Sequence, residues 1–186
     1  MTNPDAPPAV IPTPTDIAEE NLLKPLDLIN LKREHVKRLA NQNGAAGEIE
    51  VLAANIHFLP RPKGVGLVTL LAALRGAGIV IKKAGFDAIA LPAGCNVDFN
   101  DMDSVKTYLA EMTFIEIKTA NQARVKSDFS GFFFAFTEGE LMASEALGSR
   151  HRVMLLNKVT GAMLLTSVPE LLARARSTNW QVSVQL

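Results

Sequence analysis

The sequence has very few of the residues that build disulfide frameworks and zinc centres. It contains one cysteine, Cys95, and three histidines, His35, His57 and His151, in 186 residues. A single cysteine excludes an intrachain disulfide and any cysteine-rich zinc site. Because the three histidines lie far apart in the sequence, a metal site built on histidine is not expected either.

Long apolar runs and an excess of charge of one sign are also absent. No run reaches the roughly 18 to 20 apolar residues of a membrane span, and the start of the chain lacks the basic segment of a signal peptide. Lys and Arg together number 19, as do Asp and Glu, so bulk charge gives no argument for nucleic acid. With 48% hydrophobic and 20% charged residues, the sequence predicts a soluble, cytoplasmic protein with one folded domain and no membrane partner.

The first 43 residues differ in composition from the rest. Residues 1–16 hold five of the ten prolines and no aromatic residue, which is typical of a disordered, Pro-rich tail. Residues 17–43 place leucine, isoleucine and valine near a helical period and predict an N-terminal helical extension. We therefore expect a single domain over 17–186, of which 17–43 is an added helical segment.

Helical and strand patterns alternate along the remaining chain and predict an α/β fold. The earlier patterns predict helices over 47–58 and 67–75, paired strands over 79–83 and 87–91, and an acidic excursion over 92–113 with a short helix near 104–110. The later patterns predict strands over 114–119, 132–136, 153–157, 163–166 and 180–186, with helices over 138–146 and 171–176 that begin at capping boxes. A mixed central sheet flanked by helices on both sides accounts for this order.

The strand predicted over 114–119 separates apolar from charged side chains. Ile115 and Ile117 point to one face, and Glu116 and Lys118 point to the other. Asp87 begins another predicted strand, the one that returns antiparallel after the turn at Ala84-Gly85. If the two strands are neighbours, an acid, a second acid and a lysine meet at one place.

Such a trio suits hydrolysis of phosphodiester bonds. Two carboxylates can hold Mg²⁺ while the ion keeps several waters, and the metal lowers the pKa of a bound water. A lysine beside that water can orient or deprotonate it and can neutralise charge on the phosphate. Exposed strand faces often carry a Glu-x-Lys pair that has no function, so this pair alone does not establish a site.

The order of these elements resembles the PD-(D/E)XK, or restriction-endonuclease-like, nuclease superfamily. Gly85-Phe-Asp87 precedes Phe114-Ile-Glu-Ile-Lys-Thr119, and in that superfamily an Asp opens one strand and an Asp/Glu-x-Lys motif lies on the next. The Phe-rich segment 132–136, the helix that follows it and residues 150–156 are similar to uncharacterised modules of restriction and defence proteins. The resemblance covers about residues 47 to 165.

The resemblance implies a restriction-endonuclease-like fold and a Mg²⁺-dependent endonuclease acting on DNA, with Mn²⁺ as a substitute ion. Asp87 and Glu116 would bind the metal, Lys118 would act on the water, and Gln122 would assist, although a turn-forming role for Gln122 is an alternative. Many relatives use a further acid from the first helix, and Glu48 or Glu50 fits that position or serves only the helix dipole.

The sequence departs from the superfamily pattern at two points. Phe86 stands where the superfamily has proline before the first Asp, and the long interval between Asp87 and Glu116 requires an insertion over 92–113. Within that insertion the sequence offers three acids that could replace Asp87 as a ligand: Asp98, Asp101 and Asp103.

Basic residues flank the acidic stretch on both sides, which favours a DNA partner. A homodimer and a partner subunit of a restriction system are expected by analogy. Two alternatives stay open: a catalytically silent module of the same fold that binds nucleic acid or a partner, and a structural protein whose helix over 22–39 is its interface.

Overall fold

A computed structural model of the chain describes residues 44–55 and 57–178. The chain divides into two units, Met1–Ala40 and Asn41–Leu186, and the described residues belong to the second. The tail predicted over 1–16, the helical extension over 17–43 and the strand over 180–186 lie outside the described residues.

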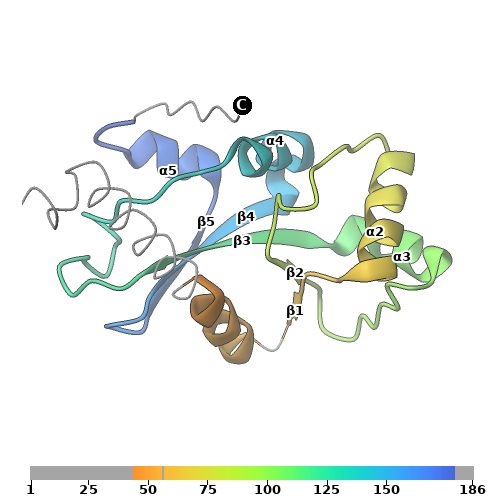
Figure 1. The fold of residues 1–186 in the computed structure, drawn as a ribbon, viewed down its shortest axis with the longest axis horizontal. Helices are drawn as coiled ribbons and strands as arrows, with labels where there is room; N and C mark the ends of the chain where they lie inside the picture. The colour runs from red at the N-terminus through yellow and green to blue at the C-terminus, as the bar shows by residue number, and fades with distance from the viewer. Residues whose placement is uncertain (1–43, 56, 179–186) are drawn as a thin grey trace, which may run out of the picture. The chain divides into compact units, whose positions relative to one another are not determined.

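Five strands form one mixed sheet in the order β1-β2-β3-β4-β5 (Figure 1). They are β1 (Phe58–Pro60), β2 (Ala88–Ala90), β3 (Thr113–Ala120), β4 (His151–Asn157) and β5 (Ala162–Thr166). The β3 and β4 strands run parallel, and the other neighbouring pairs are antiparallel. A parallel pair needs a long crossover, and the segment with α4 (Glu138–Leu147) provides it.

Helices cover both faces of this sheet (Figure 1). A helix over residues 44–54 lies on one face, and α4 and α5 (Val168–Arg174) lie on the other. At one end of the sheet, α2 (Gly64–Gly76) packs with α3 (Met102–Tyr108), which a 3₁₀ turn over Leu109–Glu111 extends. Among the described helices, none has the length and apolar character needed to cross a bilayer.

The core divides along the two faces of the sheet. On one face, Val51 of the helix over 44–54 packs with buried side chains of the sheet: Ala88, Ile115, Ile117, Met154 and Leu156. On the α4 face, Phe114 joins a cluster with α2 and α3, and Ala120, Val153 and Leu155 join a cluster with the Phe-rich segment and α5. Because side chains alternate along β3, Glu116 and Lys118 lie on the α4 face between these two clusters.

Several sequence predictions are confirmed. The mixed sheet with helices on both faces, the long strand β3, the capping box of α4 and the hairpin of β4 and β5 all occur. The short helix expected near 104–110 is present as α3 and the 3₁₀ turn. The first helix occupies 44–54 instead of 47–58, because the chain turns at Asn55 and enters β1 at Phe58.

The strand predicted over 79–83 is wrong. These residues form no strand, and β1 takes the place beside β2 that the hairpin prediction assigned to them. The side chains of Ile79 and Ile81 pack against the α2 cluster, and the Ile79 N–H donates to the Leu74 carbonyl at the end of α2. The alternating pattern therefore arises from packing on a helix end.

The strand predicted over 132–136 is also wrong. The segment is extended, with Phe132, Phe134 and Phe136 half-buried and Phe133 exposed, but it joins no sheet. The ring of Phe134 lies tilted against Phe132 and edge-to-face against Phe136, at centroid distances of 4.9 and 5.2 Å. Aromatic packing against β4, β5 and α5 thus produces the same alternation as strand pairing.

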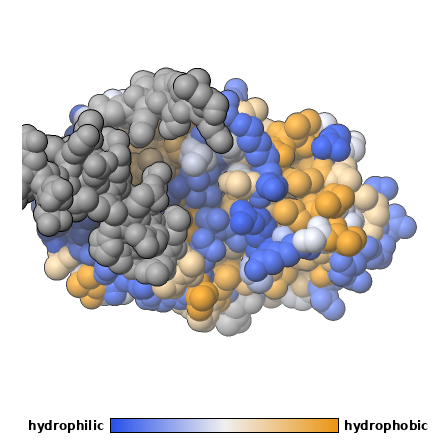
Figure 2. Space-filling view, in the orientation of Figure 1, coloured by the Kyte–Doolittle hydropathy of each residue, from blue (hydrophilic) through white to orange (hydrophobic). Residues whose placement is uncertain are grey.

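Apolar surface gathers at the end of the molecule that α2 occupies (Figure 2). Val65 and Val68 on the outer side of α2 are exposed by 68% and 67%. The sequence of α2 carries no charged residue before Arg75, so its apolar positions exceed what one buried stripe requires.

Candidate functional site

The strand β3 carries two charged side chains into the interior of the α4 face. Glu116 is only 4% exposed, and the side chain of Lys118 is 14% exposed. Lys118 Nζ lies 2.8 Å from Glu116 Oε1. The second oxygen, Glu116 Oε2, is buried and has no hydrogen-bond partner among the described residues. A buried carboxyl oxygen without a partner is costly, so this atom points to a function for Glu116.

A second carboxylate reaches the same lysine from α4. Glu140 Oε2 lies 2.7 Å from Lys118 Nζ, and the ring centroid of Phe136 lies 5.3 Å from that nitrogen. The sequence indicated Glu140 only as part of a capping box with Thr137, which it forms. No sequence signal linked it to Lys118, because the contact depends on how α4 crosses β3.

Asp87 lies directly before β2, beside the position of Glu116 on β3. The Asp87 N–H donates to the Ile115 carbonyl at 2.8 Å, and Asp87 Oδ2 accepts from the Ile117 N–H at 3.0 Å. The carboxylate therefore takes the place of a backbone carbonyl where the β2 ladder ends. Its other oxygen, Oδ1, lies 4.0 Å from Arg61 Nη1.

The loop that carries Asp87 is held at its backbone carbonyls. Arg61 Nη1 donates to the Phe86 carbonyl at 2.7 Å, and His151 Nε2 lies 3.2 Å from the Gly85 carbonyl oxygen. Gly85 also allows α4 to approach closely, because a Cβ at this position would lie 2.8 Å from the Ala143 Cβ. The condition under which the sequence groups Asp87 with Glu116 is met, because β2 and β3 are neighbours and pair antiparallel.

Burial and mutual repulsion change the ionisation of these acids. Burial, with the charge of Asp87, raises the pKa of Glu116 to about 9. Burial also raises the pKa of Asp87, against the opposing hydrogen bond from Ile117 and the charges of Arg61 and Lys118. Both shifts favour the protonated forms of the two acids, and a bound cation would oppose them.

The pKa of Lys118 is also raised, which for a lysine favours the charged form. Burial alone lowers the pKa of Lys118, but the Glu116 and Glu140 carboxyl groups outweigh burial and raise it. The nearby His151 is 1% exposed, and its burial lowers its pKa although the Gly85 carbonyl opposes the shift. The cluster thus joins a cationic lysine, a neutral histidine and three carboxyl groups.

The two acids of the first helix differ in position. Burial and the charge of Asp87 raise the pKa of Glu48, and the charges of Arg61 and Lys63 oppose that shift. Glu48 therefore lies within range of the charge of Asp87. Glu50 follows two residues later, about 200° further around the helix, and does not share this position.

The remaining candidates have local roles. Gln122 lies in the loop after β3, and its exposed side chain accepts a hydrogen bond from Arg124. The backbone carbonyl of Gln122 accepts a hydrogen bond from the Asn157 side chain. Asp101 caps α3 by accepting from the Asp103 and Ser104 N–H groups, and Asp98 accepts from the Asn100 N–H. These contacts favour Asp87 over the acids of the 92–113 insertion as the partner of Glu116.

The donor set fits a hard, mostly hydrated cation. Glu116 Oε2 is buried without a partner, Asp87 Oδ1 has only a long contact with Arg61, and both are carboxylate oxygens of the kind that Mg²⁺ prefers. Across the described ranges 44–55 and 57–178, no group of three or more His, Cys, Asp or Glu residues is arranged to hold a metal ion. The structure thus offers two close carboxyl groups, with water left to complete the shell.

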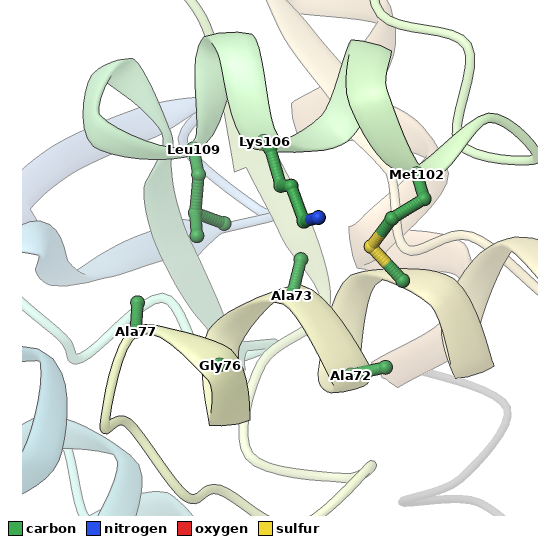
Figure 3. A pocket seen from close by; sticks show the side chains of 7 residues that line it. All are labelled: Ala72, Ala73, Gly76, Ala77, Met102, Lys106 and Leu109. Carbon is green, nitrogen blue, oxygen red and sulfur yellow. The ribbon is translucent and has the colours of Figure 1, made fainter.

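A shallow depression between α2 and α3 lies apart from these charges (Figure 3). Lys106 and the residues beside it from α3 face the small side chains of α2 across it. The lining residues are Ala72, Ala73, Gly76, Ala77, Met102, Lys106 and Leu109. None of them belongs to the charged cluster, and a single lysine among alanines offers no pair of catalytic groups.

Comparison with known proteins gives no relative: no family model, no curated protein and no solved structure matches this chain.

Proposed function

We propose that the protein is a Mg²⁺-dependent endonuclease of the restriction-endonuclease-like fold that hydrolyses DNA phosphodiester bonds. The observation that carries the proposal is the buried Glu116 carboxyl group, whose Oε2 has no partner among the described residues, beside Asp87 and Lys118. The two acids lie on neighbouring strands, as the resemblance to the PD-(D/E)XK superfamily implies. Membership of a restriction or defence system, a homodimer and a partner subunit stay predictions.

The metal would be held by Asp87 and Glu116, with Glu48 as the further acid that the resemblance implies. When bound there, Mg²⁺ would polarise the phosphate and lower the pKa of a coordinated water. Because the raised pKa of Glu116 favours the protonated carboxyl group, cation binding competes with a proton there.

Lys118 has a narrower role than the sequence allowed. Its carboxyl neighbours keep it charged, so it cannot accept a proton from water at neutral pH. A charged ammonium group can orient the attacking water and neutralise charge that develops on the phosphate. We therefore assign Lys118 to electrostatic stabilisation instead of general base catalysis.

Basic side chains beside Asp87 favour a polyanionic substrate. Arg61 lies at the sheet edge next to Asp87, and Lys63 is close enough to Glu48 to oppose the rise in its pKa. Cations at the rim of an acidic site can bind the phosphates on either side of the bond to be cleaved.

Cleavage of supercoiled plasmid with Mg²⁺ or Mn²⁺, against EDTA, tests the proposal. We expect Asp87→Asn, Glu116→Gln and Lys118→Ala each to lower the cleavage rate by at least about 100-fold, as the loss of one electrostatic group does in other enzymes. Glu138→Gln is the matched control, because Glu138 lies exposed on α4 and pairs with Lys82 away from the cluster. Undiminished cleavage in the Asp87 and Glu116 variants would rule out this site.

The second candidate is a catalytically silent module of the same fold that binds nucleic acid or a partner protein. The observation that favours it is the pairing of Lys118 with two carboxyl groups, which leaves the ammonium group neutralised inside the protein. A folded protein that binds DNA but does not cleave it with either metal would support this candidate. A rise in melting temperature with Mn²⁺ that Glu116→Gln abolishes would speak for the metal site.

A further inference from the structure

Glu140 makes two kinds of contact from the first turn of α4. Its Oε2 accepts from the Thr137 N–H at 3.0 Å, which closes the capping box, and the same oxygen lies 2.7 Å from Lys118 Nζ. The Glu140 N–H in turn donates to Thr137 Oγ1 at 3.3 Å. The helix start and the lysine of the candidate site therefore share one oxygen atom.

A second helix cap in the same chain shows that this arrangement is not required for capping. Ser167 caps α5 by accepting from the Glu170 N–H, and Glu170 Oε2 accepts a hydrogen bond from Thr166 Oγ1. Glu170 is exposed, whereas Glu140 is only 7% exposed. The start of α5 therefore relies on its serine cap alone, without the full capping box of α4 and without a lysine partner for its glutamate.

We propose that Glu140 is a positioning residue for the candidate site, and that its carboxylate fixes the Lys118 ammonium group beside Glu116. A lysine side chain has a flexible four-carbon stem, and holding it in one conformation costs entropy. Glu140, Glu116 and the ring of Phe136 surround the ammonium group and hold it in one place.

Glu140 becomes more important if Glu116 binds a cation, a step that rests on the proposed function. The Glu116 carboxylate would then share its charge with the cation, and its attraction for Lys118 Nζ would weaken. Glu140 is kept in place by its bond from Thr137 and is free of that competition. It would hold the lysine at the site during the reaction.

The order of the lysine ammonium group tests the proposal without any assay of activity. In the metal-free full chain labelled with ¹⁵N, relaxation of the ammonium nitrogens can be assigned to Lys118 by its loss in Lys118→Arg. We expect a high order parameter in the unaltered protein and a loss of order in Glu140→Ala. Glu140→Gln should restore the order, because the amide oxygen can accept both hydrogen bonds.

Two controls separate positioning from general stability. Thr137→Ala removes the hydroxyl cap and should lower the melting temperature, but it should leave Lys118 ordered. Glu170→Ala alters the other capped helix and should leave Lys118 unchanged. An ammonium group that stays equally ordered in folded Glu140→Ala would overturn the proposal, as would an equal loss of order in Thr137→Ala.

Kinetics provide a second readout that depends on the proposed function. In plasmid cleavage, Glu140→Ala should lower kcat by about tenfold to 100-fold, the scale of a misplaced catalytic group, and leave KM nearly unchanged. Glu140→Gln should recover most of that loss. If the unaltered protein does not cleave DNA, the endonuclease proposal fails, while the ammonium measurement still decides the role of Glu140.

Discussion

The two faces of β3 are both covered by a helix, but one face buries apolar side chains and the other buries charged ones. On one face, Ile115 and Ile117 pack with Val51 beneath the helix over 44–54 and bury no charge. On the other face, Glu116 and Lys118 are buried to a similar degree beneath α4. One strand thus carries an apolar layer and a charged layer on opposite sides of the same backbone.

The difference separates what the fold needs from what it tolerates. Apolar residues of similar volume in place of a buried ion pair are often neutral or stabilising, so folding does not require charges at Glu116 and Lys118. The isoleucine face by contrast contributes burial of about 1.5 to 3 kcal/mol for each fully buried side chain. We infer that the charged face is retained for a purpose other than stability.

Truncation of a side chain on the apolar face should lower the stability of the fold and leave the cleavage rate unchanged. Ile115 is fully buried, and Ile115→Ala should lower the free energy of unfolding by about 3 kcal/mol, within the range of about 2 to 5 kcal/mol for such cavities. Urea unfolding measures this loss. The cleavage rate per folded molecule should be unchanged. A loss of cleavage as large as that of Lys118→Ala would contradict the assignment of stability to one face and of function to the other.

Local signals explain which parts of this strand and its coverings the sequence predicts. The alternation over 114–119 and the capping box at Thr137 each lie within a few residues, and both features occur where expected. The strand β1 has only three residues and ends in Pro60, so pairing with β2 defines it and no local pattern does. Ile79 and Ile81 alternate like a strand but pack on the end of α2.

The same reasoning applies to the candidate site. Asp87, Glu116 and Lys118 could be grouped from sequence on one condition, that their two predicted strands are neighbours, and β2 and β3 meet it. Glu140 could not, because its contact with Lys118 spans 22 residues and depends on the path of α4 across the sheet. Sequence patterns report the face on which a residue lies, and they do not report which helix residue meets it.

Enlarging a residue on the apolar face should have a smaller effect than a cavity. Gly47 packs on β3 so closely that a Cβ would lie 2.0 Å from Thr119 Oγ1. Gly47→Ala should therefore cost about 2 kcal/mol, within the range of about 1 to 3 kcal/mol for overpacking. Urea unfolding of Gly47→Ala, Thr119→Ala and the double variant measures the coupling between the two positions.

The double variant is the informative member of that cycle. Thr119 Oγ1 is buried without a hydrogen-bond partner among the described residues, so Thr119→Ala sacrifices no bond. It removes the contacts of the new methyl group with Oγ1 and Cγ2 at 2.0 and 2.9 Å and leaves only the Thr119 Cβ at 2.9 Å. We expect Gly47→Ala to cost clearly less in that background. Equal costs in both backgrounds would mean that the helix over 44–54 shifts to relieve the clash.

The charged face should make the stability of the folded protein depend on pH, whereas the apolar face should not. The pKa of Glu116 rises from its usual 4.5 to about 9 because of burial and the charge of Asp87. Below pH 4.5 the group is protonated in both states and has no effect on stability. As the pH rises from 4.5 to about 9, the unfolded chain releases the proton and the folded protein keeps it, so the contribution of Glu116 becomes steadily less favourable.

Glu116→Gln removes this contribution and isolates it. The difference in unfolding free energy between Glu116→Gln and the unaltered protein should grow in favour of the variant by at most about 1.4 kcal/mol per pH unit within that interval, as urea titrations at successive pH values would show. Glu138→Gln is the control of opposite sign, because the hydrogen bond from Lys82 lowers the pKa of Glu138. A difference that stays constant with pH for Glu116→Gln would mean that the buried carboxyl group is ionised in the free protein, and that cation binding has no proton to displace.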